Sequence, residues 1–209
     1  MNPKVAVIDY GMGNLRSVSK AFEVCGAQVE IITGPDEIKD ADGLVLPGVG
    51  ALGDCVEGLR NCRLIDTVES WIADDRPFFG VCLGFQALYD FSEEGSVRGL
   101  GIFPGRVKQF RLPETYKVPH MGWNSVEFSD LDDPIVESLS SSNDQFYFVH
   151  SYYVDPQDEK SAFFKTDYGH VFASGIKVGN VIATQFHPEK SQKIGLTLYR
   201  NFLKLVENS

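Results

Sequence analysis

The sequence predicts an α/β fold with a doubly wound, mostly parallel central sheet, helices on both faces and added antiparallel strands. In the first half of the chain, short runs that are apolar throughout alternate with segments of helical periodicity, which is typical of parallel strands buried on both faces. The second half instead has closely spaced strand-like runs with Gly or Asn at their turns. The 209 residues, 43% of them hydrophobic, suit one domain, which we expect to span residues 1–209.

The individual elements follow from these patterns. A helical segment ends at Gly26, a residue type favoured after the last helical turn, and Gly179-Asn180 joins two strand-like runs as a hairpin. Ser191 is positioned to cap a final helix through about residue 206, with an apolar stripe of Ile194, Leu198, Phe202 and Leu205. We expect strands at 5–9, 28–33, 43–46, 78–81, 102–110, 124–128, 146–154, 162–166, 170–177 and 181–186, and helices at 15–24, 51–59, 64–73 and 85–91.

Charge and cysteine content exclude several classes of function. With 19 basic and 29 acidic residues, the net charge is -10, so binding to a nucleic acid or to an anionic membrane is disfavoured. The uncharged stretch 77–89 is too short to span a bilayer, and the N-terminus lacks the pattern of a signal peptide. The four cysteines have no C-x-x-C spacing, so we expect reduced thiols in the cytoplasm.

Residues 80–84, Gly-Val-Cys-Leu-Gly, are the cysteine version of a nucleophile elbow, the sharp strand-to-helix turn G-x-S-x-G. Glycine on each side permits the close backbone approach that such a turn requires. The side chain of Cys82 should therefore stand above the carboxyl edge of the sheet, where open α/β sheets bind ligands. The helix that follows directs its N-terminal amides at the sulfur, which favours the thiolate. Cys82 is the candidate nucleophile, whereas Cys25, Cys55 and Cys62 lack flanking glycines and suit a packing role.

A base and its orienting group follow the last predicted strand. His187 lies where that strand ends, and Pro188 stops the strand and fixes the turn. The carboxylate of Glu189 can then fold back on the imidazole, as the acidic member does in other catalytic triads. Taken alone, this segment could equally be a surface loop. Together with an elbow cysteine it predicts a Cys82, His187 and Glu189 triad.

Acyl chemistry also needs donors for the developing oxyanion. The amide of Leu83, directly after the nucleophile, is one candidate. The glycine-rich turn at residues 47–50, Pro-Gly-Val-Gly, can supply a second through the amides of Val49 and Gly50. An ordinary strand-ending turn would explain the same glycines.

The sequence contains no complete motif for binding a nucleotide cofactor or a metal. Gly11 and Gly13 follow the first strand, but Arg16 occupies the third glycine position of a dinucleotide fingerprint. A phosphate-binding G-x-x-x-x-G-K-[ST] run is absent, and the histidines and cysteines are not at metal-ligand spacing. We expect neither a cofactor nor a metal.

The motifs together resemble those of class I (triad-type) glutamine amidotransferases. The resemblance rests on the turn at 47–51, the elbow at 80–86 and the segment His187-Pro188-Glu189. Three stretches are more narrowly similar to the glutaminase subunits of imidazole glycerol phosphate synthases: residues 47–50, residues 119–124 (Pro-His-Met-Gly-Trp-Asn) and residues 147–152 (Tyr-Phe-Val-His-Ser-Tyr). The resemblance covers essentially the whole chain.

This resemblance implies a chemistry for the site. Cys82 would attack the side-chain carboxamide of glutamine, His187 would protonate the departing ammonia, and water would hydrolyse the γ-glutamyl thioester to glutamate. Before the oxyanion hole is complete, the Val49 amide would have to rotate. The substrate would be held by Gln86 and by the backbone around His150, Ser151 and Tyr152.

The resemblance also implies a partner. Ammonia would pass to a separate (β/α)₈ cyclase subunit, which makes imidazole glycerol phosphate and an aminoimidazole carboxamide ribotide in histidine biosynthesis. Asn14, Tyr147 and Lys190 would face that cyclase in a heterodimer.

Three other functions are compatible with some or all of these motifs. A glutaminase subunit of a different synthase, for example one that amidates a sugar, could keep the same motifs. A stand-alone cysteine γ-glutamyl hydrolase would need no partner, and a non-catalytic binding subunit would not need an intact triad.

Overall fold

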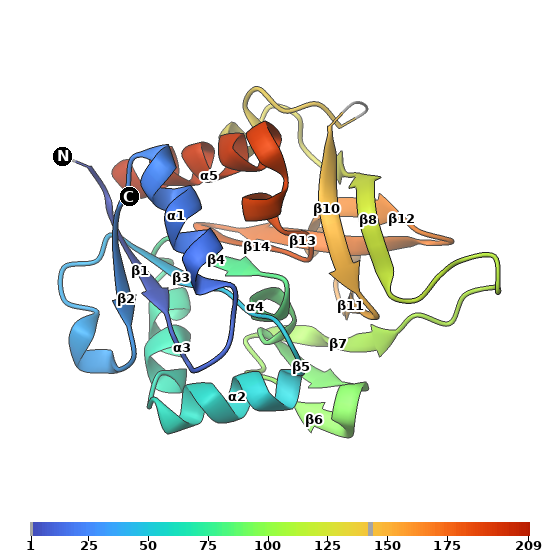
Figure 1. Cartoon of the computed structure of the whole chain (residues 1–209), viewed down its shortest axis with the longest axis horizontal. Coiled ribbons are helices and arrows are strands. Elements are labelled where there is room, and N and C mark those ends of the chain that lie inside the picture. The colour runs from blue at the N-terminus through green and yellow to red at the C-terminus, as the bar shows by residue number, and fades with distance from the viewer. Residues whose placement is uncertain (1, 142–143) are drawn as a thin grey trace.

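A computed structural model describes residues 2–141 and 144–209. It has three layers: a large mixed sheet with helices on each of its two faces (Figure 1). In Figure 1, α1 (Leu15–Cys25) and α5 (Gln192–Glu207) lie above the sheet, and α2 (Leu52–Asn61) and α3 (Ile65–Ala73) lie below it. The predicted fold class is confirmed.

The parallel half of the sheet positions the site. Its strand order is β2-β1-β3-β4-β14, and every pair in this half is parallel. The carboxyl ends of β3, β4 and β14 therefore lie side by side at one edge of the sheet. The strands of this half are β1 (Lys4–Ile8), β2 (Gln28–Ile32), β3 (Gly43–Leu46), β4 (Phe78–Val81) and β14 (Val181–Thr184).

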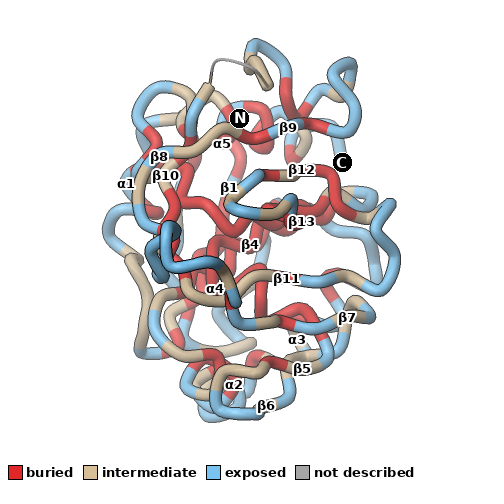
Figure 2. Tube along the Cα trace, turned by 90° about the vertical axis from the view of Figure 1, so that its right-hand side faces the viewer, coloured by how far each residue is buried: buried red, intermediate tan, exposed pale blue. Residues whose placement is uncertain are grey.

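The two apolar clusters of the core lie on opposite faces of these strands. Val5 and Val7 of β1 pack in the cluster that includes α1 and α5, whereas Ala6 and Ile8 pack in the cluster that includes α2 and α3. This is the two-residue alternation of a strand with both faces buried. Figure 2 shows the same arrangement as buried central segments surrounded by exposed turns.

The second half of the chain extends the sheet with mostly antiparallel strands, in the order β14-β13-β11-β7-β5-β6, and β12 and β9 pair beside β13. The hairpin at Gly179-Asn180 is confirmed, since Val178 pairs with Val181 across it. A separate two-stranded sheet is formed by β8 and β10. These strands are β5 (Tyr89–Ser92), β6 (Val97–Arg98), β7 (Phe103–Gln109), β8 (His120–Ser125), β9 (Glu127–Phe128), β10 (Gln145–His150), β11 (Tyr152–Pro156), β12 (Ala162–Asp167) and β13 (Val171–Val178).

Two expected single strands are each divided between two sheets. The segment predicted at 146–154 forms β10 and β11, with Ser151 between them, and the segment predicted at 124–128 forms the end of β8 and then β9. β8 pairs with β10, whereas β11 and β9 belong to the large sheet. The break after His150 turns the chain from one sheet into the other.

The helix predicted at 85–91 was wrong over most of its length. The helix that follows the elbow, α4, spans only Leu83–Gln86, and Tyr89–Ser92 is the strand β5. The backbone of this region pairs instead with a distant loop, since the amides of Leu100 and Ile102 donate to the carbonyls of Ala87 and Leu88. A helix of four residues has only a small dipole, so the expected effect of a helix N-terminus on the sulfur is weak.

Ser191 precedes α5 but makes no capping hydrogen bond with its side chain, contrary to expectation. Its hydroxyl instead donates to the carbonyl oxygen of His187 at 2.6 Å and accepts from the Tyr147 amide at 3.0 Å. The segment between β14 and α5 contains one 3₁₀ turn, Pro188–Lys190. Ser191 therefore ties the segment that carries His187 to β10.

Candidate active site

Cys82, His187 and the predicted substrate-binding residues line one pocket at the carboxyl edge of the parallel strands, and Glu189 lies behind His187. The pocket has a volume of about 320 Å³, a size typical of small-molecule sites. Val49 and Gly50 follow β3, Cys82 follows β4, and His187 lies shortly after β14. The pocket is lined by Val49, Gly50, Cys82, Leu83, Gln86, Glu94, Pro119, Val149, His150, Ser151, Tyr152 and His187.

Cys82 has the strained backbone of a nucleophile elbow. Its φ of 53° and ψ of -101° lie outside the regions that a residue with a side chain usually occupies. A methyl group on Gly84 would lie 1.9 Å from the carbonyl oxygen of Leu46, and one on Gly80 would lie 2.9 Å from the Gly84 carbonyl oxygen. The two glycines are therefore required by the tight turn from β4 into α4. The Cys82 amide is fixed by donation to the Thr184 carbonyl at 2.7 Å.

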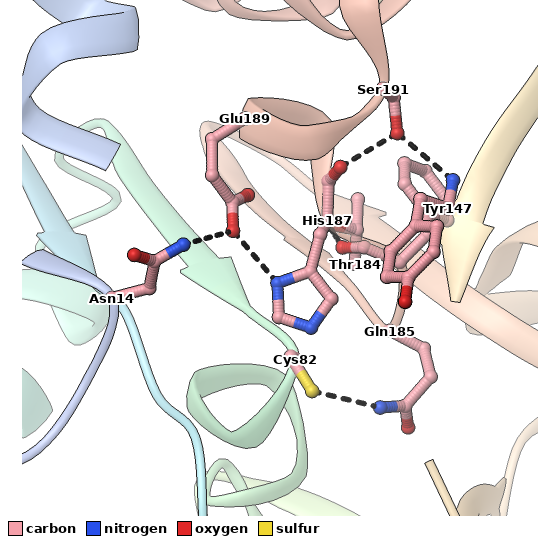
Figure 3. A network of polar contacts seen from close by, with 9 residues as sticks. Asn14, Cys82, Tyr147, Thr184, Gln185, His187, Glu189 and Ser191 are labelled. Carbon is pink, nitrogen blue, oxygen red and sulfur yellow. Dashed lines mark hydrogen bonds and ion pairs between the residues drawn. The ribbon is translucent and has the colours of Figure 1, made fainter. Parts of the chain in front are cut away.

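His187 and Glu189 form a buried pair beside the sulfur. The Nδ1 atom of His187 and the Oε1 atom of Glu189 are 2.8 Å apart, and their side chains are 1% and 0% exposed. This contact leaves Nε2 as the ring nitrogen that faces Cys82 (Figure 3). Nε2 is buried and has no hydrogen bond with any described residue, so it is free to exchange a proton with a reacting group.

The charges around His187 favour its imidazolium form. Burial alone lowers the pKa of this histidine, but the neighbouring Cys82 sulfur and the Glu189 carboxylate outweigh it and raise the pKa to about 10. The folded protein therefore holds the proton on His187 at neutral pH. A protonated imidazole beside a cysteine can act first as a general acid.

The predicted oxyanion donor at Leu83 is already occupied. The Leu83 amide donates to the carbonyl oxygen of Gly48 at 3.4 Å. The turn at 47–50 therefore presents a carbonyl oxygen, rather than a donor, to the position next to the nucleophile. While this hydrogen bond is in place, the Leu83 amide is not free to bind an oxyanion.

The predicted substrate-binding residues line the same pocket. The side chain of Gln86 donates both amide hydrogens inside the protein, to the Tyr152 carbonyl oxygen at 3.1 Å and to Gln185 Oε1 at 2.8 Å. Ser151 and Tyr152 line the pocket from the turn between β10 and β11. These contacts leave the side-chain carbonyl oxygen of Gln86 for a ligand.

Two residues of the site were missed by the sequence reasoning. Glu94 lines the pocket and accepts the Leu52 amide at 3.0 Å through Oε2. Gln185 is fully buried, and its Nε2 lies 3.5 Å from the Cys82 sulfur (Figure 3). Gln185 lies two residues before His187, and this closeness to the predicted base could have indicated that Gln185 belongs to the site. Glu94 had no local signal, because a contact 42 residues away holds it in place.

The three residues expected at a partner interface all lie around the triad. Asn14 Nδ2 donates to Glu189 Oε1 at 3.4 Å, so it shares the oxygen that binds His187. Lys190 is exposed, and its Nζ lies 5.8 Å from the ring centre of the half-buried Tyr147. Tyr147 in turn accepts the His187 amide through its backbone carbonyl at 2.9 Å. Any contact made by these residues is thus made next to the catalytic groups.

The other cysteines and the potential metal ligands are the remaining candidates for reactive groups. All four cysteines are free thiols, and burial raises the pKa of Cys55 to about 12, which makes it unreactive. Within residues 2–141 and 144–209, no cluster of His, Cys, Asp or Glu could hold a metal ion. In the same part of the chain, no helix is both long and apolar enough to cross a membrane.

Comparison with known proteins places this chain in a family. The chain is 48% identical over 206 residues to the imidazole glycerol phosphate synthase subunit HisH of Aquifex aeolicus, with 98% of each chain covered. It is 50% identical to the HisH subunit of Nitrosococcus oceani, covering 95% of this chain and 96% of the relative.

Solved structures share the fold at lower identity. One is PurLQS from Thermotoga maritima, with a TM-score of 0.77 and 18% identity over 98% of this chain and 99% of that chain. Another is a glutamine amidotransferase from the same organism, with a TM-score of 0.69 and 15% identity over the full length of both chains. Residues 6–205 match the family described as glutamine amidotransferase class-I. The chain therefore belongs to the class I glutamine amidotransferases and, among them, to the family of imidazole glycerol phosphate synthase HisH subunits.

Proposed function

We propose that this chain is the glutaminase subunit of an imidazole glycerol phosphate synthase and releases ammonia from glutamine through Cys82, His187 and Glu189. The observation that carries the proposal is the site itself. A cysteine on a strained turn and a buried histidine bound to a carboxylate line the same pocket of small-molecule size. The full-length similarity to HisH subunits supports the choice of synthase.

The first half of the reaction forms a thioester. The Cys82 thiolate attacks the side-chain carbonyl carbon of glutamine, and the oxygen takes the negative charge. The tetrahedral intermediate collapses as His187 Nε2 gives its proton to the departing nitrogen, which leaves as ammonia. Glu189 holds the ring through Nδ1 during this transfer and stabilises its charged form.

The second half regenerates the enzyme. His187 is now neutral and takes a proton from water, and the resulting hydroxide attacks the thioester carbon. The bond between that carbon and the sulfur breaks, which returns the Cys82 thiolate and releases the γ-carboxylic acid of glutamate, whose proton passes to solvent. His187 again carries the proton, so the triad ends in its starting state.

The pocket has groups suited to the two ends of glutamine. The Glu94 carboxylate and the carbonyl oxygen of Gln86 are acceptors that match the α-ammonium group. The turn around Ser151 and Tyr152 lies along the same wall and supplies backbone groups to the rest of the substrate. We assign Glu94 to substrate binding on this basis.

The occupied Leu83 amide favours a partner-dependent enzyme over a stand-alone hydrolase. Breaking its hydrogen bond to the Gly48 carbonyl and turning the following peptide would free Leu83 and bring the Val49 amide toward the oxyanion. A hydrolase that works alone needs this hole to be open at rest. A subunit that must supply ammonia only when the acceptor is bound benefits from an oxyanion hole that is blocked at rest.

The partner in this proposal is a cyclase subunit with a (β/α)₈ barrel, which contacts the chain at Asn14, Tyr147 and Lys190 and uses the ammonia in histidine biosynthesis. Enclosed transfer is needed because ammonia released into neutral water becomes ammonium, which is not nucleophilic. The four free thiols suit the reducing cytoplasm, where we place the complex.

The test is an assay of glutamate release by the chain alone, with the cyclase subunit, and with both that subunit and its ribotide substrate. We expect release to rise strongly only in the last mixture. Cys82→Ala should abolish synthesis from glutamine and leave synthesis from added ammonia intact. High release by the isolated chain would favour a stand-alone hydrolase, and loss of both syntheses in Cys82→Ala would contradict the division of labour.

A further inference from the structure

A line of buried hydrogen bonds runs through two histidines, His150 in the pocket wall and His120 behind it. His150 Nδ1 lies 2.7 Å from the Tyr152 carbonyl oxygen, and His150 Nε2 lies 3.0 Å from His120 Nδ1. His120 Nε2 in turn lies 3.3 Å from Asn124 Nδ2. Both histidines are buried, with exposed fractions of 3% for His120 and 6% for His150. Neither has a step of its own in the proposed reaction.

The Tyr152 carbonyl oxygen determines which atom donates in each hydrogen bond of this line. A carbonyl oxygen can only accept, so His150 Nδ1 must carry the hydrogen. Burial lowers the pKa of His150 to about 3 and that of His120 to about 4, so both rings are neutral. His150 Nε2 then accepts from His120 Nδ1, and His120 Nε2 accepts from the Asn124 amide. Each ring is held in one tautomer.

The same carbonyl oxygen links this line to the sulfur. The Tyr152 oxygen also accepts from Gln86 Nε2, so both of its lone pairs are used. The second Gln86 hydrogen goes to Gln185 Oε1, which leaves Gln185 Nε2 as the group facing the Cys82 sulfur at 3.5 Å. The orientation of both glutamine amides thus depends on an acceptor that His150 helps to hold.

We propose that His120 and His150 are positioning residues that fix the amides of Gln86 and Gln185, so that an N–H donor faces the Cys82 sulfur and an oxygen faces the substrate. The inference rests on the proposed function of Cys82. A donor at 3.5 Å stabilises the thiolate more than the thiol, because a charged acceptor binds an N–H more strongly. An inverted Gln185 amide would direct a carbonyl oxygen at the thiolate and repel it.

Packing alone does not account for these two polar rings. They lie among apolar aromatic side chains: His120 stacks on Phe148 with ring centres 4.7 Å apart, and His150 lies 5.3 Å from Phe110. Phenylalanine would fill this space without the cost of burying polar nitrogens. The outer end is also secured, since Asn124 donates to the Asp167 carbonyl oxygen at 2.9 Å and accepts the Ser125 amide at 2.8 Å.

The test compares two variants at one position with a matched control. His150→Phe keeps an aromatic ring but removes both hydrogen bonds, whereas His150→Asn keeps an N–H near the Tyr152 oxygen. His170→Phe is the control, because His170 also packs against Phe110, at 5.7 Å, and takes no part in the line. His120→Phe, which removes only the donor to His150, is a second variant should His150→Phe fail to fold.

Two measurements report on the proposal. One is the rate at which iodoacetamide alkylates Cys82 in the isolated chain, followed by mass spectrometry of its peptide. The other is KM and kcat for glutamine in the complex with the cyclase subunit. We expect His150→Phe to slow alkylation and raise KM by about 3- to 10-fold each, the range of one or two neutral hydrogen bonds. His120→Phe should shift both in the same direction by less, His150→Asn should recover most of the loss, and His170→Phe should match the wild type.

A role in packing alone would give a different result. Both His150 variants would then lower the thermal midpoint, the asparagine more than the phenylalanine, with wild-type alkylation and KM. That result would overturn the inference. Failure of the proposed function is distinguishable, because the wild-type complex would then release no glutamate, while the alkylation rates would still test the line of hydrogen bonds.

Discussion

Replacing Glu189 by glutamine would remove the charge that faces His187 while keeping an acceptor oxygen in place. The wild-type contact is 2.8 Å long and lies between side chains that are 1% and 0% exposed, so solvent screens it little. The raised pKa of His187, about 10, depends on this carboxylate together with the Cys82 sulfur. The variant should therefore bind the ring but hold its proton less firmly.

The size of the effect can be estimated from the lost charge. A hydrogen bond to a charged group contributes about 1.5–3 kcal/mol, and one pKa unit corresponds to about 1.4 kcal/mol. The pKa of the imidazolium should fall by about one to two units. Because the raised pKa keeps the imidazolium at all pH values below it, activity is lost as pH rises through it. The alkaline limb should therefore move from near pH 10 to about pH 8–9.

The assay is kcat/KM for glutamine in the complex, measured from about pH 6 to pH 10. Glu189→Gln should retain measurable activity near neutral pH, unlike Cys82→Ala, because Glu189 orients a ring rather than transferring a proton. Glu137→Gln, at a surface ion pair with Lys204, is the control and should keep the wild-type profile. An alkaline limb that stays in place in Glu189→Gln would refute the electrostatic role assigned to this carboxylate.

Three further outcomes test the fold and the interface. Gly84→Ala would place a methyl group 1.9 Å from the Leu46 carbonyl oxygen, so we expect a thermal midpoint lower by roughly 10 °C or no folded protein. Gly53→Ala is the control and should melt as the wild type does, because its methyl group would meet nothing closer than 3.5 Å. His150 has a folded pKa of about 3 and an unfolded pKa of about 6.5, so its contribution to the free energy of unfolding is complete above about pH 6.5. Below that pH the contribution declines by up to about 1.4 kcal/mol per pH unit, down to about pH 3. Denaturant titrations at stepped pH should show this slope in the wild type and a smaller slope in His150→Phe. Lys190→Ala should weaken calorimetrically measured binding to the cyclase by about 5-fold without changing the thermal midpoint, and unchanged affinity would remove Lys190 from the interface.

The candidate catalytic residues could be named from the sequence because each belongs to a short signature with a local mechanical cause. The elbow around Cys82 needs two glycines within five residues, and His187 and Glu189 are separated only by a proline. The doubly wound sheet was predictable for a related reason, since uniformly apolar runs such as Phe78–Val81 are buried on both faces. In these cases the pattern and its cause lie in the same stretch of chain.

The features that were missed depend on distant contacts. Tyr89–Ser92 overlaps the run that predicted a helix at 85–91, but it forms a strand because Tyr89 pairs with Phe103 in a parallel strand. Ser191 has the residue type of a helix cap, yet its hydroxyl oxygen accepts the Tyr147 amide of β10 instead of an amide of α5. Glu94 lies in the pocket because the Leu52 amide anchors it from 42 residues away. No single window of sequence contains both halves of such contacts.

The hydrogen bond between Leu83 and Gly48 has a consequence for inhibitor design. Reagents that alkylate the sulfur form no oxyanion, so they should label Cys82 whether or not the Leu83 amide is free. A glutamine-like aldehyde, in contrast, adds to the sulfur as a hemithioacetal whose oxygen must be held by that amide. Such aldehydes should be selective for the assembled, substrate-loaded synthase, and their potency would report how often the turn opens.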